Sequence, residues 1–198
     1  MTVEQAAAEH RAVERIVLGA FESLTGRRSA PLRYAMMDDT PVGLLGLAAG
    51  DKGLRRLSYS RSEDEFLQRL LAEHGDVPVL RSALDDVRRA LERYFAGRRL
   101  DFDLPVDLSG MPLFHRRVLD ATARIRAGHV ATYTQVARQA GSPRASRAAG
   151  NALHNNPVAI IVPCHRVLRT DGSLGGYGGG LPIKEWLLEH EGALPRSI

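Results

Sequence analysis

The sequence predicts a mixed α/β (α+β) fold in two lobes. The N-terminal lobe is expected to hold a small three-stranded antiparallel sheet with helices, and the C-terminal lobe to be mostly helical. Short apolar runs separated by turn-forming residues occupy residues 32–59 and predict the strands. Apolar residues at three- and four-residue spacing fill most of the remainder and predict helices. With 198 residues, 44% of them hydrophobic, the chain can bury an ordinary globular core.

An amphipathic helix is predicted at the N-terminus. Apolar side chains recur at helical spacing from Val3 to Leu24, and the pattern stops before Gly26. We interpret this segment, residues 1–30, as a helical extension that supports the rest of the chain; a docking helix or a partner-binding element is the alternative.

The N-terminal α/β lobe is predicted to span residues 31–108. Its strands are expected at residues 33–37, 42–48 and 54–59, and its helices at residues 62–71 and 82–96. Ser82 is the expected N-cap of the second helix, with Asp85 three residues later. The stretch that follows, residues 98–110, contains Pro105 and alternating aspartates, so we place the boundary between the lobes there.

The C-terminal lobe is predicted to span residues 109–198 and to contain a helix-turn-helix. Helices are expected at residues 112–127, 133–140 and 144–153. Thr132 and Gln135 have the spacing of a capping box at the start of the second helix, and Pro143 suits the first position of the third. Two short helices joined by a turn that contains glycine are typical of a helix-turn-helix.

The last of these helices carries small side chains. Ala148, Gly150 and Asn151 are among them, and Arg147 is the single long cation amid the small residues from Ala145 to Ala152. A helix that reads base edges in the major groove normally carries longer polar side chains. Small side chains let a backbone come close to a neighbour, which is either something bound or another part of the same protein.

Positive charge is concentrated in the C-terminal half. The net formal charge of +4 combines −2 over residues 1–110, with 16 basic and 18 acidic groups, and +6 over residues 111–198, with 11 basic and 5 acidic groups. A positive surface favours an anionic partner, and nucleic acid is the commonest large one. A solvated charged surface is the alternative.

Features of several other protein classes are missing from the sequence. No run of about twenty apolar residues could span a bilayer, and residues 1–15 lack the basic start and apolar centre of a secretory signal. A single cysteine allows neither an internal disulfide nor a multi-thiolate zinc site. We therefore expect a cytoplasmic protein with no membrane partner, no metal and no cofactor.

The only cysteine follows an apolar run and a proline. Residues 160–162 are β-branched, Pro163 follows, and Cys164 and His165 come next. This pattern predicts a nucleophile at the end of a buried strand, with an inert core cysteine as the alternative. A thiol of ordinary pKa, near 8.5, needs a base, but neighbouring side chains on a strand face opposite ways. His165 would therefore act through a bridging water or after a local turn.

Two further features of the site stay open from the residues alone. A carboxylate that fixes the tautomer of His165 could come from any acid of this lobe. The candidates are Asp120, Asp171, Glu185, Glu189 and Glu191. Glycines surround Tyr177 within residues 172–180, and they form either a pocket wall or a plain surface loop.

Several blocks of sequence resemble one family. They are Pro163-Cys164-His165-Arg166-Val167, residues 156–162, residues 176–181 and residues 184–188. These blocks resemble the 6-O-alkylguanine-DNA alkyltransferases, also called methylated-DNA–protein-cysteine methyltransferases. The resemblance is strong from residue 113 to residue 191, weaker over residues 32–110, and absent from the first 30 residues.

The resemblance implies DNA repair by direct reversal. Cys164 would attack the alkyl carbon of 6-O-alkylguanine in DNA, and of 4-O-alkylthymine, and keep the group as a thioether after a single turnover. His165 would form the thiolate through a water, and Glu191 would orient His165. Tyr133 would contact the guanine and promote its departure.

The resemblance also implies how the damaged guanine is held. The carbonyls of Cys164 and Val167 would accept from its exocyclic amine, and the amide of Gly178 would face the substituted oxygen, with Tyr177 beside it. Asn156 would shape the turn before the cysteine.

Double-stranded DNA carrying alkylated guanine is the implied partner, and a monomer is expected to bind it. The helix with Ala148, Gly150 and Asn151 would enter the minor groove. The target nucleotide would be flipped out of the stack, and Arg147 would fill the space it leaves.

The chain departs from the family pattern at a few positions. Leu119 replaces a common tryptophan, His115 replaces a glutamine, and Arg126-Ala127 replaces an apolar residue and a proline. These positions lie on a supporting helix and at its end, so they concern local packing more than chemistry.

Three other functions compete with single-turnover transfer. An alkyltransferase-like protein would bind the lesion without transferring anything, but in such relatives the cysteine is replaced. A sequence-specific transcription factor would need more base-reading side chains on its second helix. A thiol hydrolase would need a different geometry from an adjacent cysteine and histidine.

Overall fold

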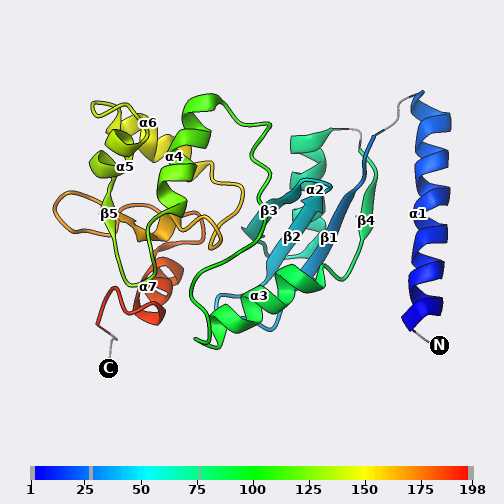
Figure 1. Ribbon diagram of the computed structural model, residues 1–198, viewed down its shortest axis with the longest axis horizontal. Coiled ribbons are helices and arrows are strands. Elements are labelled where there is room, and N and C mark those ends of the chain that lie inside the picture. Colours follow the sequence, from blue (N-terminus) through cyan, green and yellow to red (C-terminus); the bar gives the residue numbers. More distant parts are fainter. Residues whose placement is uncertain (1–2, 27–28, 76, 196–198) are drawn as a thin grey trace.

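A four-stranded sheet lies at the centre of the N-terminal half of the computed structural model, which describes residues 3–26, 29–75 and 77–195 (Figure 1). The strands are β1 (Leu32–Met37), β2 (Leu45–Gly50), β3 (Gly53–Tyr59) and β4 (Val79–Arg81), in the order β3-β2-β1-β4. β1, β2 and β3 pair antiparallel, which confirms the three predicted strands. Ala35, Leu47 and Leu57 lie side by side across them and are buried.

The fourth strand was not predicted, and it shortens the second helix of this lobe. β4 pairs in parallel with β1, and the amide of Ser82 continues the ladder by donating to the carbonyl of Tyr34 at 2.8 Å. Ser82 is therefore committed to the sheet and does not cap the helix. α3 (Asp85–Phe95) begins three residues later, after Leu84, whose φ is 45°.

Two helices cover the two faces of the sheet, because alternate strand residues point to opposite sides. Ser62 caps the start of α2 (Glu63–His74), since its hydroxyl accepts from the amide of Glu65 at 3.2 Å, and the apolar side of this helix packs on one face of the sheet. α3 packs on the other face through Val87, Leu91 and Tyr94.

α1 (Val3–Thr25) is the predicted N-terminal helix, and it stands at the opposite end of the molecule from the cysteine lobe (Figure 1). Glu14 on this helix pairs with Arg33 of β1 at 2.6 Å. Its apolar stripe is only partly covered, since Val13, Ile16 and Leu24 are exposed while Val17 and Phe21 are half-buried, and the supporting role stays a prediction. Residues 1, 2, 27 and 28 of the predicted extension lie outside the described residues.

The C-terminal half is mostly helical, as predicted. Its elements are α4 (Leu113–Ala123), β5 (Ala131–Thr132), α5 (Tyr133–Gln139), α6 (Ser146–His154), the 3-10 helix η1 (Cys164–Arg166), β6 (Val167–Leu168) and α7 (Leu181–His190). β5 and β6 form a short parallel pair. The capping box is confirmed, because the hydroxyl of Thr132 accepts from the amide of Gln135 while the Gln135 side chain accepts from the amide of Thr132. Residues 196–198 lie outside the described part of the chain.

Two helix boundaries in this half differ from the prediction. α4 ends at Ala123, four residues early, because the amides of Arg124 and Ile125 donate to the carbonyls of Ala121 and Thr122 and tighten the last turn. α6 begins at Ser146, because the amide of Ala145 bonds to the carbonyl of Ser142 at 2.9 Å and closes a turn there. Pro143 therefore lies before the helix.

The predicted strand that leads into the cysteine is wrong. Residues 158–163 form successive turns: Ile160 has a φ of 68°, and the amide of Cys164 donates to the carbonyl of Val162 at 2.8 Å. The side chain of Asn156 holds these turns by donating to the Val162 carbonyl at 2.8 Å and accepting from the Val158 amide at 3.0 Å. Cys164 then opens a turn of 3-10 helix, so the alternating geometry of a strand does not apply to it.

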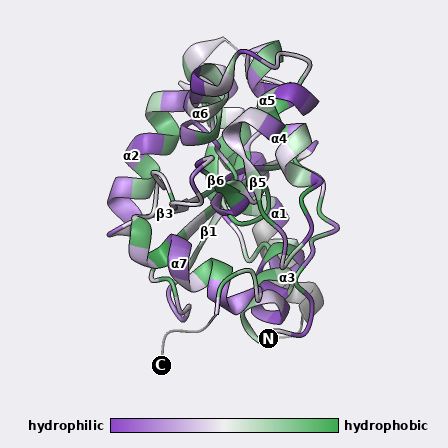
Figure 2. Ribbon diagram, turned by 90° about the vertical axis from the view of Figure 1, so that its left-hand side faces the viewer, coloured by the Kyte–Doolittle hydropathy of each residue, from purple (hydrophilic) through white to green (hydrophobic). Residues whose placement is uncertain are grey.

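One apolar core connects the two halves. Val158, Ile160 and Leu187 pack with the sheet and α3, and the amide of Ala159 donates to the carbonyl of Leu57 at 3.0 Å. Figure 2 shows the hydrophobic stretches around β5 and β6 near the centre, with hydrophilic residues of α2 and α5 toward the outside. None of the helices in the described ranges is long and apolar enough to cross a membrane.

Candidate active site

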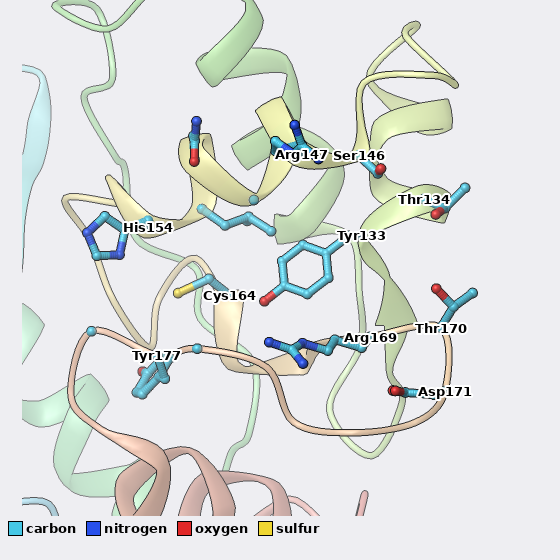
Figure 3. A pocket seen from close by; sticks show the side chains of 15 residues that line it. Tyr133, Thr134, Ser146, Arg147, His154, Cys164, Arg169, Thr170, Asp171 and Tyr177 are labelled. Carbon is cyan, nitrogen blue, oxygen red and sulfur yellow. The ribbon is translucent and has the colours of Figure 1, made fainter.

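A cavity of about 810 Å³ lies beside the cysteine, and its size suits a small ligand (Figure 3). It is enclosed by α6, the start of α5, η1 and the loop after β6. The predicted site residues that line it are Tyr133, Arg147, Gly150, Asn151, Cys164, Tyr177 and Gly178. The fold thus gathers residues from four separate segments around one thiol.

The thiol of Cys164 sits among groups with opposing effects on its charge. Burial raises its pKa above the ordinary value, whereas the Asn156 side chain, donating to Sγ at 3.2 Å, and the positive charge of Lys184 lower it. Burial has the largest effect, so the resting thiol is protonated at neutral pH. A proton acceptor is therefore needed before the sulfur can act as a nucleophile.

His165 is fully buried and is oriented by a carboxylate. Its Nε2 lies 2.9 Å from Oε1 of Glu191, while Nδ1 has no hydrogen-bond partner among the described residues. Burial lowers the pKa of His165, so the ring is neutral. A neutral ring that donates from Nε2 to Glu191 keeps the lone pair of Nδ1 free to accept a proton.

Glu191 accepts hydrogen bonds from three side chains. Besides His165, the guanidinium of Arg166 donates to both carboxylate oxygens at 2.7 and 2.8 Å, and the hydroxyl of Tyr94 donates at 2.7 Å. Burial would raise the pKa of Glu191, but the hydrogen bonds from His165 and Arg166 hold it at about 2. The carboxylate is therefore charged at every physiological pH.

Lys184 is a second buried charge near the thiol. Its ammonium donates to the carbonyl of Val167 at 2.7 Å and to that of Leu174. Burial lowers the pKa of Lys184 to about 8. Val167 itself is fully buried on β6 and does not line the cavity, although the resemblance assigns its carbonyl to the substrate.

Tyr133 forms one wall of the cavity. Its ring packs against α6 at Gly150, where an added Cβ would lie 3.7 Å from the ring. Burial and the neighbouring Cys164 raise the pKa of Tyr133, so its hydroxyl stays protonated and is a donor. A Cβ at Gly175 would lie only 2.9 Å from this hydroxyl, which explains why the loop passing beneath it carries a glycine there.

Tyr177 forms the opposite wall and is tied to the N-terminal half. Its hydroxyl lies 2.7 Å from that of Tyr59, at the end of β3, and the two rings pack edge to face. Burial raises the pKa of Tyr177 well above its ordinary value. A Cβ on Gly179 would lie 2.6 Å from the Tyr59 ring, so the loop can approach Tyr59 only because a glycine stands there.

The predicted DNA-contact residues divide between the cavity and the surface. Arg147, Gly150 and Asn151 on α6 line the cavity, whereas Ala148 is exposed on the same helix and does not. Asn156 lies behind Cys164 and acts on the turn and the thiol. Among the described residues, no histidine, cysteine, aspartate and glutamate side chains gather in a group that could hold a metal ion.

Several residues of the site have roles that the sequence did not indicate. Tyr94, Arg166 and Lys184 surround the His165–Glu191 pair and the thiol, and Tyr59 supports Tyr177. Arg166 and Lys184 lie within the blocks that carry the family resemblance, which was the available signal. Tyr59 and Tyr94 are ordinary core tyrosines in pattern, and only the three-dimensional fold brings them to the site.

Comparisons with known proteins point to one family from residue 32 to residue 193. Residues 32–108 match the family model of the ribonuclease-like domain of 6-O-methylguanine DNA methyltransferase, and residues 113–193 match that of its DNA-binding domain. The methylated-DNA–protein-cysteine methyltransferase of Methanosarcina acetivorans is 37% identical over 161 residues, which cover 81% of this chain and 99% of the relative. The protein of the same name from Mycolicibacterium paratuberculosis is 40% identical over 158 residues, covering 77% and 88%.

A solved structure shows the same fold. The crystal structure of Mycobacterium tuberculosis OGT in complex with DNA superposes with a TM-score of 0.69 at 36% identity, covering 82% of this chain and 93% of that one.

Proposed function

The chain belongs to the 6-O-methylguanine DNA methyltransferase family, and on that ground we propose that it repairs DNA by moving an alkyl group from 6-O-alkylguanine to Cys164. It is a DNA-binding methyltransferase of the methylated-DNA–protein-cysteine class. The observation that carries the proposal is the thiol in the cavity, next to a buried histidine that a charged carboxylate orients. By the same chemistry, 4-O-alkylthymine is a second substrate.

The reaction begins with loss of the thiol proton. A water between Sγ of Cys164 and the free Nδ1 of His165 passes the proton to the ring, and Glu191 stabilises the imidazolium that forms. Asn156 and Lys184 stabilise the thiolate, since both lower the pKa of the thiol.

Transfer of the alkyl group follows by displacement. The thiolate forms a bond to the alkyl carbon while the bond between that carbon and the guanine oxygen breaks, and the bonding electrons stay with the guanine. The hydroxyl of Tyr133, which is protonated, donates to the departing base and offsets its charge. The thioether left on Cys164 has no route back to a thiol, so each protein molecule acts once.

The target base reaches the thiol by leaving the helix. The sulfur lies inside a cavity, so an alkylated oxygen within a stacked duplex is out of its reach. The small side chains of α6 suit the minor groove, which is about 6 Å wide. Arg147 fills the vacated stack, and Gly178 and Tyr177 hold the base.

A single copy of the chain binds the DNA in this proposal. A cytoplasmic location stays a prediction of the sequence.

A lesion-binding protein without transfer activity is the alternative, and the presence of Cys164 in the cavity speaks against it.

Mass spectrometry tests the proposal directly. After incubation with an oligonucleotide that contains 6-O-methylguanine, the intact protein should gain one methyl group per chain, on the peptide that contains Cys164. Cys164→Ser is the matched control and should gain none. An unchanged mass of the parent protein, with lesion binding intact, would support the non-catalytic alternative instead.

A further inference from the structure

Arg169 is the second arginine of the cavity, and the proposed function gives it no role. It lies at the end of the strand segment that follows the cysteine, on the wall opposite α6 and Arg147 (Figure 3). The residue is exposed, and its guanidinium makes no hydrogen bond and no ion pair with any described residue; its charge acts only at longer range, on Asp171 and Tyr133. A cation lining a cavity without a protein partner is available to a ligand.

The backbone holds Arg169 in place. Its amide donates to the carbonyl of Ser173 at 2.9 Å, and its carbonyl accepts from the amide of Gly172 at 3.0 Å, which closes a tight turn. A Cβ on Gly175 would lie 3.6 Å from Cγ of Arg169 and 2.9 Å from the Tyr133 hydroxyl. The stem of Arg169 and the Tyr133 hydroxyl therefore share the space that Gly175 leaves, which fixes where the side chain starts and leaves the guanidinium free to meet a ligand.

The nearest acid does not neutralise this cation by direct contact. Asp171 also lines the cavity, but its carboxylate accepts from the hydroxyl of Ser173 at 2.7 Å and from the Ser173 amide at 2.9 Å. These hydrogen bonds hold it within its own turn and lower its pKa. Across the lining residues, one carboxylate faces two guanidinium groups, so the cavity carries a net positive charge.

We propose that Arg169 binds a backbone phosphate of the damaged strand, next to the flipped nucleotide. This rests on the proposed function. A guanine whose substituted oxygen meets Cys164 leaves its sugar and flanking phosphates at the mouth of the cavity, where Arg169 stands. The planar guanidinium matches a phosphate in a bidentate way. Arg169 thus holds the strand on one side while Arg147 occupies the stack on the other.

Substrates with and without a backbone separate this role from base recognition. We expect Arg169→Ala to slow methyl transfer from single-stranded and duplex oligonucleotides by roughly tenfold, the order of one charged hydrogen-bonded contact. Reaction with free 6-O-benzylguanine should stay unchanged, and Arg169→Lys should recover part of the loss. An equal loss with the free base would show that Arg169 contacts the base, and would overturn the proposal.

A neutral phosphate identifies the contact. Methylphosphonate is placed in turn at the phosphates 5′ and 3′ of the lesion. At one of these positions the substitution should slow methyl transfer by the parent protein roughly tenfold, as much as Arg169→Ala does on ordinary DNA. Transfer by Arg169→Ala should not slow further on the same substituted DNA. Additive losses at both positions would exclude a direct contact.

Salt dependence gives a readout that does not need the reaction. With Cys164→Ser as background, the slope of log affinity against log salt for lesion DNA should fall by about one for Arg169→Ala. Arg126→Ala is the matched control, because Arg126 is exposed on the same lobe but lines a different cavity. Equal slopes for the two variants would overturn the contact. If the parent protein took up no alkyl group on Cys164, the proposed function would be refuted. The salt dependence of binding would still test the contact between Arg169 and the phosphate.

Discussion

At the residue scale, one carboxylate sets the protonation state of the site. Glu191 is 5% exposed and receives four hydrogen bonds from His165, Arg166 and Tyr94. Its negative charge favours the neutral His165 tautomer with a free Nδ1 and raises the affinity of that nitrogen for a proton. The basicity of the relay therefore depends on the charge of Glu191 and not only on its position.

Replacing this charge should change the pH profile of the reaction. In Glu191→Gln the side chain keeps its shape but loses its charge, so His165 becomes a weaker base. We expect the pH–rate profile with free 6-O-benzylguanine to move upward by about one pH unit. Glu185→Gln, on the exposed side of α7, is the control and should leave the profile in place. An unchanged profile in Glu191→Gln would argue against the relay.

At the element scale, the helix-turn-helix carries Tyr133 and Arg147, the two cavity residues that we propose act on the base from the DNA side. α5 begins with the capping box at Thr132, and this fixes Tyr133 at the first helical position, beside the cavity. α6 then packs on α4 and α5 through Ala149, Ala152 and Leu153, and it presents Gly150 and Arg147 to the cavity. One buried face therefore positions the wall of the pocket and the arginine together.

Removing the arginine should distinguish duplex from single-stranded substrates. In Arg147→Ala no side chain fills the vacated stack, so nothing offsets the free-energy cost of extruding the base. We expect repair of duplex DNA to slow by roughly 10- to 100-fold, which corresponds to a few kcal/mol of unstacking. Single-stranded DNA and free 6-O-benzylguanine should react nearly as before. A comparable loss on all three substrates would refute the stacking role.

Elements could be predicted where the signals are local. The capping box of Thr132 and Gln135 and the apolar spacing of α1, α2 and α5 involve residues within one or two turns of each other, and these elements form as expected. β4 has three residues, and its pairing with β1 spans more than forty positions, so no local pattern reveals it. The turns at residues 158–163 likewise depend on the Asn156 side chain, which overrides the β-branched run.

At the scale of the whole molecule, the site lies where the two halves meet. Tyr94 reaches Glu191 from α3, and Tyr59 reaches Tyr177 from β3, so the sheet side of the molecule contacts both the relay and the pocket wall. The division of the chain into lobes at residues 31–108 and 109–198 stays a prediction. The shared core makes cooperative unfolding of both halves the expected behaviour.

Acid should destabilise the protein through Glu191. Its pKa is about 2 in the folded state and 4.5 as the ordinary value, so its contribution is present above pH 4.5 and is lost as the pH falls toward 2. This difference corresponds to about 3 kcal/mol of unfolding free energy. Urea unfolding between pH 6 and pH 2 should show that the parent protein loses about this much more than Glu191→Gln. Parallel pH dependences of the two proteins would contradict the assignment, and Glu185→Gln should behave like the parent.

The sequence by itself determined the chemistry and most of the helices. The cysteine motif, the small-residue helix with Arg147 and the glycines around Tyr177 are short-range features, and their resemblance to one family identified the reaction class and pointed to Glu191. The residues alone left five acids open as partners of His165.

Only the tertiary structure decided how these parts meet. Glu191 reaches His165 because α7 ends against η1, and Tyr94 reaches Glu191 across 97 positions of sequence because the core closes around both. In the tertiary structure the residues before Cys164 form turns instead of the expected strand, and Arg169 lies opposite Arg147. The physical reason is that local sequence patterns report interactions over a few residues, whereas a catalytic site forms from contacts that exist only once distant apolar segments pack together.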